Sequence, residues 1–449
     1  MCPDDLDGGA AEMTSAVYPA AISQRLLWQA AFRSPAGATG TPQLYSIPDL
    51  DATALQRALT ELRSRHEALR TCLVGAGARL MQEVSDPGPL PLEWVDDGDD
   101  LAPVDRGRRE PGHEVIARAQ RQSQAGSLLL DVDHLLADAW SCNLLGDELS
   151  VLYLAYREGR EPELPAVGWQ YRHFAEWQHG RLSGDSLHQL QASWLARLDG
   201  AESAWLPRPA SRVPRRERSS VIRWFGGGSE AARALAQLRA ASRTTLPAAA
   251  VTMFFLQLGL LSGQEDIAIG SIFANRANVL SWRTVGLFAH LVPLRLGLGP
   301  DLTVRNLLAR GHEMMTFALA NQELPMSLLP AGAVKRETAV GVNNVVINVL
   351  PPAGKGRGRP DRESGIVPAP VTMPSGARFD FELVLLPRSS QLDYFVRYAT
   401  DRFSPEWVEE FGHSLFDLIQ AAAADVDVTV GQLRRRCLPR IESLAALAD

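Results

Sequence analysis

An apolar run in the first third of the chain ends in a group of titratable side chains. Residues 128–130 are all leucine and are followed by Asp131, Asp133, His134 and Asp138. Beyond them the apolar positions recur at helical spacing, so the segment predicts a buried strand, a turn and a helix. A turn at the end of a buried strand is a place where side chains can reach a substrate. These residues are therefore candidates for chemistry.

The residues alone allow three roles for His134: a structural histidine, a metal ligand or a general base. A metal site is the weakest, because Asp131, Asp133 and Asp138 supply oxygen but no second histidine or cysteine lies nearby. An imidazole titrates near neutral pH and bonds through two nitrogens, which suits a base. For Asp138 the simplest role is a helix cap, since its carboxylate can accept hydrogen bonds from the backbone of the first turn. The choice for His134 stays open.

Helical and strand patterns alternate along the whole chain, which is typical of a mixed α/β (α+β) protein. One helix is expected after Asp51, a plausible N-cap, with apolar positions that run from Leu55 to Leu69. Further helices are expected at 138–156, 171–182, 188–200, 229–242, 246–263 and, as the last, 405–424. Strands are expected at 91–95, 127–132, 266–273, 290–298, 343–350, 381–386 and 394–400.

The length of 449 residues exceeds what one hydrophobic core usually supports, so two domains or lobes are expected. A linker is placed at 201–220, because Pro, Arg and Ser are concentrated there. That division gives an N-terminal lobe at 15–200 and a C-terminal lobe at 221–430. Residues 351–378 are rich in Gly and Pro and are expected to form a long loop of the second lobe.

Composition and charge limit the partners and the compartment. The 45 basic and 52 acidic residues give a net charge of −7, so no nucleic-acid partner is expected. The four cysteines lie far apart, which argues against a zinc site or a disulfide scaffold and fits a reducing cytoplasm. The N-terminus lacks the pattern of a signal peptide, and the apolar stretch 246–263 is expected to be a buried helix, not a membrane span.

The segment DHLLADAWS at 133–141 resembles HHxxxDG, the active-site signature of the condensation domains of non-ribosomal peptide synthetases. These domains belong to the chloramphenicol-acetyltransferase-like superfamily. Further stretches of the chain resemble the other family motifs in the same order. They are SQRLLW at 23–28, RHEALRT at 65–71, YRHFAEWQ at 171–178, SWLARLDG at 193–200, GQEDIAIGSIFANR at 263–276, VGLFAHLVPLRL at 285–296, NQELP at 321–325, NNVVINV at 343–349 and YATDRFS at 398–404.

The resemblance implies two similar α/β lobes in a V arrangement with a central tunnel. Donor and acceptor would enter it from opposite faces on the phosphopantetheine arms of carrier proteins, and no metal, nucleotide or redox cofactor would be required. His134 matches the catalytic histidine of the motif and would act as the general base or positioning group. Asp138 matches the aspartate of the motif and Arg276 the arginine that pairs with it, so these two residues would support the active site structurally.

Three positions depart from the family pattern. Asp133 replaces the first histidine, Ala139 replaces the glycine, and His290 stands where asparagine is usual. The added methyl group of Ala139 would disturb the turn if the backbone there needs a positive φ. Trp140 and Ser141 complete the motif, and with the three departing residues they are possible tunnel or active-site residues.

Two other functions stay as alternatives. Asp133, Asp138 and Ser141 also form the D-x-x-x-x-D-x-x-S frame of heterocyclisation domains, although a histidine inside that frame is unusual for them. A catalytically inactive, condensation-like docking platform is the other, since the first histidine and the glycine are altered. Epimerisation is a weaker rival, because its glutamate-bearing motif is not evident in the second half.

The function expected from the resemblance is a condensation-type acyltransferase. It would join an acyl or aminoacyl thioester on an acyl or peptidyl carrier protein to an amine, giving an amide, or to a hydroxyl, giving an ester. The acceptor would be a small molecule or a second carrier-bound group. No adenylation or carrier sequence is visible in the 449 residues, so we expect a free-standing enzyme of natural-product or antibiotic biosynthesis, or one excised from a larger synthetase.

Overall fold

The computed structural model describes most of the chain, and the contacts within it form two units. The described residues are 16–33, 40–95, 115–122, 125–207, 219–334, 344–350, 366–369, 375–376, 379–387 and 391–447. The first unit comprises Met1–Ser183, Ala274–Ala289 and Ala353–Met373. The second unit comprises Gly184–Phe273, His290–Pro352 and Pro374–Asp449.

The chain crosses between these units more than once, whereas the division expected from the sequence was drawn between continuous halves. Helix α5, Gly184–Leu198, belongs to the second unit although it precedes the expected linker. Ala274–Ala289 returns to the first unit, where Val285 packs in the hydrophobic core. The points where the chain passes from one unit to the other depend on tertiary contacts, and the amino-acid composition does not change there in a way that marks them. Residues 208–218 of the expected linker lie outside the described residues.

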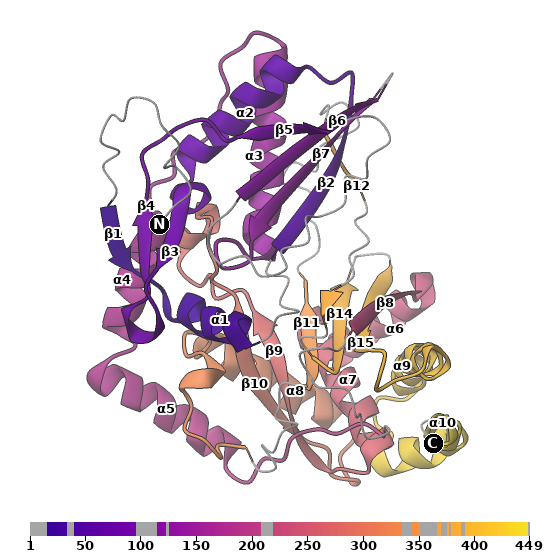
Figure 1. Ribbon diagram of the computed structural model, residues 1–449. Coiled ribbons are helices and arrows are strands. Elements are labelled where there is room, and N and C mark those ends of the chain that lie inside the picture. The colour runs from indigo at the N-terminus through magenta and orange to yellow at the C-terminus, as the bar shows by residue number, and fades with distance from the viewer. Residues whose placement is uncertain are drawn as a thin grey trace. The chain divides into compact units, whose positions relative to one another are not determined.

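The first unit is built on a five-stranded sheet with the order β12-β2-β7-β6-β5. Its central strand β7, Ala125–Asp133, pairs antiparallel with β2 on one side and with β6 on the other. The other strands are β2 (Gly40–Pro48), β5 (Leu92–Val95), β6 (Val115–Gln122) and β12 (Val367–Ala369). Two helices, α2 (Ala52–Arg65) and α3 (Ala139–Arg157), contact each other and cover one face of this sheet (Figure 1).

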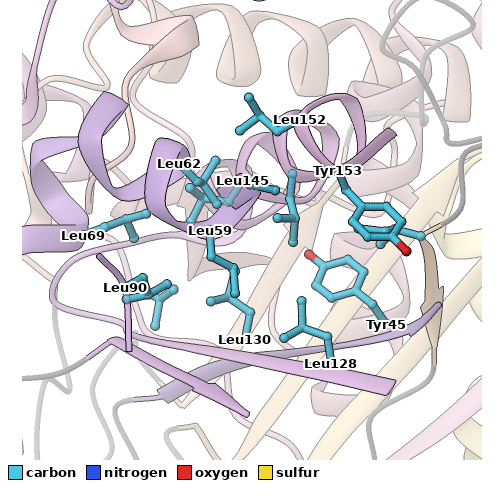
Figure 2. Close-up of a cluster of buried hydrophobic side chains, with 14 of the residues drawn as sticks. Tyr45, Leu59, Leu62, Leu69, Leu90, Leu128, Leu130, Leu145, Leu152 and Tyr153 are labelled. Carbon is cyan, nitrogen blue, oxygen red and sulfur yellow. The ribbon is translucent and has the colours of Figure 1, made fainter. Parts of the chain in front are cut away.

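Strand periodicity divides the side chains of β7 between the two faces of the sheet. Leu128, Leu130 and Val132 lie in the core shared with α2 and α3. Figure 2 shows this core, in which leucines of both helices point toward the side chains of the strands. The alternate residues, including the buried Asp131 and Asp133, lie on the face away from the helices. Two of the acids that the sequence singled out therefore share one strand and one face.

A small antiparallel sheet and two helices complete the first unit. The sheet has the order β1-β4-β3 and consists of β1 (Ala16–Pro19), β3 (Thr71–Val74) and β4 (Met81–Val84). Helices α1 (Ile22–Arg33) and α4 (Tyr171–Arg181) contact each other, and α4 also contacts β1. Both helices carry residues of the family-like motifs, so their contact brings two of these motifs together.

The second unit is built on a seven-stranded sheet with the order β10-β9-β11-β14-β15-β8-β13. Its pairs are antiparallel, except that β11 runs parallel to both β9 and β14. The strands are β8 (Ser219–Gly226), β9 (Asp266–Phe273), β10 (His290–Gly297), β11 (Val345–Val349), β13 (Ser375–Gly376), β14 (Phe381–Pro387) and β15 (Leu392–Ala399). Besides α5, the helices are α6 (Gly228–Ala241), α7 (Leu246–Ser262), α8 (Val304–Ala320), α9 (Pro405–Ala424) and α10 (Val430–Ala446).

Most expected helices and strands are present, and the mixed α/β class is confirmed. The helix capped by Asp51 ends at Arg65, and the next residues form a 3-10 turn and strand β3. Residues 351–378 were expected to be a loop, but their described part contains β12 and β13. Strands β1, β2, β4, β6 and β8 were missed.

Helices α1, α8 and α10 were also missed, the last because 405–424 was taken as the final helix. Pro439 lies inside α10, and a proline is a strong signal against a helix interior. Exposed arginines at 434–436 also interrupt its apolar pattern.

Helix α7 confirms that the apolar stretch 246–263 is a buried helix. Every residue from Ala248 to Leu260 is buried. Thr245 caps the first turn, and Gly263 ends the helix in the left-handed conformation. In the described part of the chain no single helix is long and apolar enough to cross a membrane, and α6 and α7 meet that criterion only as a pair bent by 104°.

Close packing of α8 against α7 gives a testable expectation for Gly311. A Cβ atom added there would lie 1.8 Å from Thr252 Oγ1, which is buried and donates to the carbonyl oxygen of Ala248. Gly311→Ala is therefore expected to lower the free energy of unfolding by about 1–3 kcal/mol in chemical denaturation. The matched control is Gly180→Ala in α4, where a Cβ atom meets nothing within 4 Å and a gain of up to about 1 kcal/mol is expected. Equal stability of the two variants would contradict the packing of α8 on α7.

Candidate functional site

Hydrogen bonds to Asp133 close the turn between β7 and α3. Its Oδ1 accepts from the backbone N–H of Leu135 at 2.8 Å. Its carbonyl oxygen accepts from the N–H groups of Leu136, at 2.8 Å, and Ala137, at 3.2 Å. The side chain is only 2% exposed and thus fixes the backbone on both sides of His134. Asp133 holds the shape of the turn.

His134 is partly buried in this turn, where its ring bonds to the backbone. Nδ1 lies 2.8 Å from the carbonyl oxygen of Ala137. Because a carbonyl oxygen only accepts hydrogen bonds, Nδ1 carries the proton in this contact. The neutral ring then has its lone pair on Nε2, the nitrogen that can take a proton from a substrate. The turn therefore sets both the tautomer and the orientation of the imidazole.

The buried carboxylate of Asp138 is surrounded by hydrogen-bond donors. Oδ1 accepts from the N–H and the hydroxyl of Ser141, each at 2.8 Å, and from Arg276 Nη2 at 3.0 Å. Oδ2 accepts from the N–H groups of Phe288, at 3.1 Å, and Ala289, at 3.2 Å. The expected ion pair is present, and both of its side chains are 2% exposed. Asp138 is at once the N-cap of α3 and half of this pair, two roles that the sequence had offered separately.

The guanidinium of Arg276 donates hydrogen bonds to further acceptors. Nη1 donates to the carbonyl oxygens of Ser281 and, at 2.8 Å, Thr284. Nη2 donates to Asp138 and, at 2.8 Å, to the hydroxyl oxygen of Ser141. A buried ion pair needs such additional hydrogen bonds to offset the loss of hydration. They fasten the segment 276–289 to the start of α3.

Ser141 connects the two halves of the ion pair. Its hydroxyl oxygen lies 2.8 Å from Asp138 Oδ1 and from the carbonyl oxygen of Gly286. It also accepts from Arg276 Nη2 at 2.8 Å and from the N–H of Gly286 at 3.0 Å. A hydroxyl has one proton and two lone pairs, so its bonding capacity is used within this network. Ser141 is 0% exposed and is enclosed by its partners.

Aromatic rings cover the guanidinium of Arg276. Its Cζ lies 4.1 Å from the ring centroid of Phe288 and 5.4 Å from that of Trp140. Trp140 Nε1 donates to the carbonyl oxygen of Trp282 at 3.1 Å, and Trp282 Nε1 donates to that of Arg276 at 2.9 Å. Rings in these positions attract the cation and keep water away from the ion pair. Trp140 therefore supports the network.

Gly286 lies where the network meets α4. Its carbonyl oxygen accepts from the N–H of Asp138 at 3.2 Å, in addition to the bonds with Ser141. A Cβ atom at this position would lie 1.9 Å from the ring of Tyr171, the first residue of α4. Tyr171 in turn donates from its hydroxyl to the carbonyl oxygen of Leu287. The close approach of the ring explains why a glycine is needed here.

Two glutamines that the sequence did not single out support the turn, one directly and one through helix α1. Gln24, which is 0% exposed, donates from Nε2 to the carbonyl oxygen of Leu135 at 3.0 Å. Gln178 accepts from the N–H of Ile22, the first residue of α1, at 2.8 Å. The motif SQRLLW thus holds the residue next to His134, and YRHFAEWQ holds the first residue of the helix that carries SQRLLW. A glutamine in each motif was the available signal, but sequence does not show that it is buried.

A second buried ion cluster anchors the middle of α3. Glu148 pairs with Arg65 Nε at 3.0 Å and with His66 Nε2 at 2.9 Å. Burial by itself raises the pKa of Glu148, but the hydrogen bonds and charges of His66 and Arg65 outweigh it and hold that pKa below its usual value. The motif RHEALRT therefore fixes α3 at a second point.

The remaining candidate residues lie in different settings. Ala139 is the exposed first residue of α3 and is not among the residues with positive φ, so the expected disturbance of the turn is not seen. His290 is the first residue of β10 in the second unit, and its Nε2 lies 2.7 Å from the carbonyl oxygen of Gln322.

Burial raises the pKa of the Cys142 thiol to about 12, so this neighbour of Ser141 stays protonated.

A metal site was not expected from the sequence. Among the residues that the structure describes, no group of three or more His, Cys, Asp or Glu side chains is placed to hold a metal ion.

The buried ion pair gives a testable expectation for stability. Arg276→Met keeps an apolar stem but leaves Asp138 without its counter-charge, so the free energy of unfolding is expected to fall by about 3–5 kcal/mol. Chemical denaturation measures the change. The matched control is Arg223→Met, because the pair of Arg223 with Glu409 is exposed and should contribute little. A loss no larger than that of the control would show that the network does not depend on the charge of Arg276.

Comparison with solved structures bears on the fold. SgcC5 from Streptomyces globisporus, in complex with (R)-(-)-1-(2-naphthyl)-1,2-ethanediol and sucrose, has a TM-score of 0.74 and 22% identity, and the match covers 92% of this chain and 100% of that one. The X-domain from teicoplanin biosynthesis, in its complex with OxyB, has a TM-score of 0.70 and 21% identity, with 95% and 97% coverage. At these identities the likeness shows the fold, which is the chloramphenicol-acetyltransferase-like α/β fold that the motifs implied.

Comparison of sequences bears on the family. Phosphinothricin tripeptide synthetase PhsC of Streptomyces viridochromogenes is 29% identical over 398 residues, which are 83% of this chain but only 36% of that protein. The profile of the condensation domain matches residues 115–435, which include the turn of His134, Asp138 and Arg276. The chain thus belongs to the condensation-domain family of non-ribosomal peptide synthesis, the family that its motifs predicted.

Proposed function

We propose that the chain is a condensation-type acyltransferase that joins an acyl or aminoacyl thioester on a carrier protein to an amine. The geometry of His134 carries the proposal, because the bond from its Nδ1–H to the Ala137 carbonyl oxygen sets the tautomer in which Nε2 is the basic nitrogen. The buried pair of Asp138 and Arg276 supports it, since the pair fixes the start of the helix that follows the turn. The carrier protein would present its substrate on a phosphopantetheine arm.

The proposed reaction needs mainly positioning and proton transfer. The amine nitrogen attacks the thioester carbonyl carbon, the C–N bond forms, the C–S bond breaks and the thiol of the arm leaves. His134 Nε2 takes a proton from the amine and returns one to the leaving sulfur, which restores the neutral ring. A thioester is already activated, so no covalent enzyme intermediate is needed, and alignment of the two reactants supplies much of the acceleration. The protonated Cys142 is accordingly not used as a nucleophile.

An alcohol is the second class of acceptor. The structure of SgcC5, which shares this fold, contains an aryl ethanediol, so alcohols belong among the compounds to be tested. Attack by a hydroxyl would use the same base and the same leaving group and would give an ester. The product itself separates the two cases.

Heterocyclisation has less support. The frame of Asp133, Asp138 and Ser141 is buried, and its polar atoms bond within the turn and the ion-pair network. Side chains committed in this way favour a structural role over the removal of water from a substrate.

A docking platform without turnover is the other alternative. Asp133 at the position of the first histidine favours it, and the X-domain of the same fold has a structure in complex with OxyB. A platform would have no need for an imidazole whose tautomer and direction are fixed, and this weighs toward catalysis. Turnover decides between the two.

The test is mass-spectrometric turnover of acyl-loaded carrier proteins with a panel of amines, alcohols and aminoacyl-loaded carriers. His134→Gln removes the base but keeps a polar side chain, so the rate is expected to fall about 10²–10⁴-fold. His413→Gln is the matched control, because His413 lies exposed on α9 beside Glu409 and should not affect the rate.

The mass of the product distinguishes an amide or an ester from a dehydrated ring. Turnover that survives His134→Gln would contradict the role of the histidine. Tight binding of a carrier protein with no product from any member of the panel would favour the platform.

A further inference from the structure

Gln24 supports the turn between β7 and α3 from a helix that lies far from it in the sequence. It is the third residue of α1, and its side chain belongs to a residue that is 0% exposed. Nε2 donates to the carbonyl oxygen of Leu135 at 3.0 Å. Leu135 directly follows His134, so this bond fixes a peptide group next to the imidazole.

The oxygen of the same amide caps α1. Oε1 accepts from the backbone N–H of Ala21, the residue before the helix begins, at 3.0 Å. A glutamine or glutamate at the third helical position is well suited to this contact with the N-cap residue. Both ends of the Gln24 amide are therefore engaged, and the two partners fix its orientation.

The cap alone does not explain a glutamine at this position. A glutamate would accept from the N–H of Ala21 equally well, and its charge would be favoured at the start of a helix. A buried carboxylate, however, has no proton to donate to the carbonyl oxygen of Leu135. The contact with the turn thus uses the group in which glutamine and glutamate differ.

The start of α1 is itself held by α4. Gln178 Oε1 accepts from the N–H of Ile22 at 2.8 Å, and His179 Nε2 lies 2.9 Å from the carbonyl oxygen of Ala20. Both contacts come from side chains near the end of α4. Gln24 therefore extends from a helix whose first turn is fixed.

The orientation of the His134 ring depends on the backbone that Gln24 holds. Nδ1 of the ring bonds to the carbonyl oxygen of Ala137, two residues beyond Leu135. A rotation of the peptide group that follows Leu135 would displace this acceptor. Hydrogen bonds weaken steeply as their angle departs from linearity, so a displaced carbonyl oxygen would no longer fix the tautomer.

We propose that Gln24 is a positioning residue for the reaction, which aligns the imidazole of His134 through the carbonyl group of Leu135. Because its side chain is enclosed, it acts on the rate of proton transfer and not on the binding of substrate. This inference rests on the proposed function and adds a support from α1 to the one that Asp133 gives from within the turn.

Gln24→Met tests the proposal, because it keeps the length of the side chain and removes the amide. The turnover number in the carrier-protein assay is expected to fall about 10–100-fold with KM nearly unchanged, since a misplacement of about 1 Å can cost that much. Gln257→Met is the matched control. Gln257 is 3% exposed and donates from Nε2 to the carbonyl oxygen of Phe411 at 2.8 Å in the second unit, so its loss should lower stability but not the rate.

Gln24→Glu separates the cap from the contact with the turn. The introduced carboxyl group can still accept from the N–H of Ala21, but only its protonated form can donate to Leu135. The turnover number relative to the wild type is therefore expected to fall as the pH rises. Should Gln24→Met fail to fold, Gln24→Glu at alkaline pH takes its place.

The tautomer of His134 is a readout that does not depend on turnover. Nitrogen-15 NMR of protein with labelled histidine shows which ring nitrogen of a neutral imidazole carries the proton, and the His134 signals are those absent from His134→Gln. The wild type and Gln257→Met are expected to carry the proton on Nδ1. Gln24→Met is expected to show a mixture of both tautomers, a change that a loss of stability alone would not cause.

The outcomes separate positioning from a purely structural role. An unchanged His134 signal in Gln24→Met would overturn the proposal, because the glutamine would then only stabilise the fold. A turnover number equal to that of the wild type would overturn it too, and so would an equal loss of rate in Gln257→Met. If the wild type turns over no substrate, the proposed function fails, and the NMR comparison still decides whether Gln24 aligns the ring.

Discussion

The removal of two opposite charges from water at Asp138 and Arg276 is the constraint on which the rest of this site depends. Desolvation of each ion costs several kcal/mol, and the pair is stable only if the remaining lone pairs and protons are also matched. Ser141 supplies two of these matches, and the N–H groups of Phe288 and Ala289 supply two more. A segment from the second half of the sequence is thereby locked onto the start of α3.

The consequence of this lock is a turn with little freedom. Its first residue, Asp133, bonds the backbone on the far side of His134, and Gln24 holds the carbonyl oxygen of Leu135 from outside. Ser141 belongs to the network, and the next residue, Cys142, is buried beside it. Motifs that lie far apart in the sequence therefore meet at one turn, each through one or two hydrogen bonds. An imidazole held in this way is ready to accept a proton without first reorganising.

The chemical character of the site depends on the burial and the protonation of its side chains. Ser141 is enclosed, and Cys142 stays protonated, so neither provides a nucleophile. The bond from Nδ1–H of His134 to the Ala137 carbonyl oxygen places the lone pair of the neutral ring on Nε2. The proposed base, without a nucleophile beside it, suits a substrate that arrives already activated, such as a thioester. These features agree with the family to which the chain belongs.

The sequence by itself determined the features that are local. Apolar periodicity was enough for β7 and α3, and the uninterrupted apolar stretch was enough for the buried helix α7, because both signals lie within one element. The order of the motifs determined the family and the pair of Asp138 and Arg276. Only the tertiary structure decided that 274–289 returns to the first unit, that Gln24 reaches the turn, and that Ser141 is shared by both ions. These facts depend on hydrogen bonds between residues more than a hundred positions apart, whose direction and burial no local pattern records.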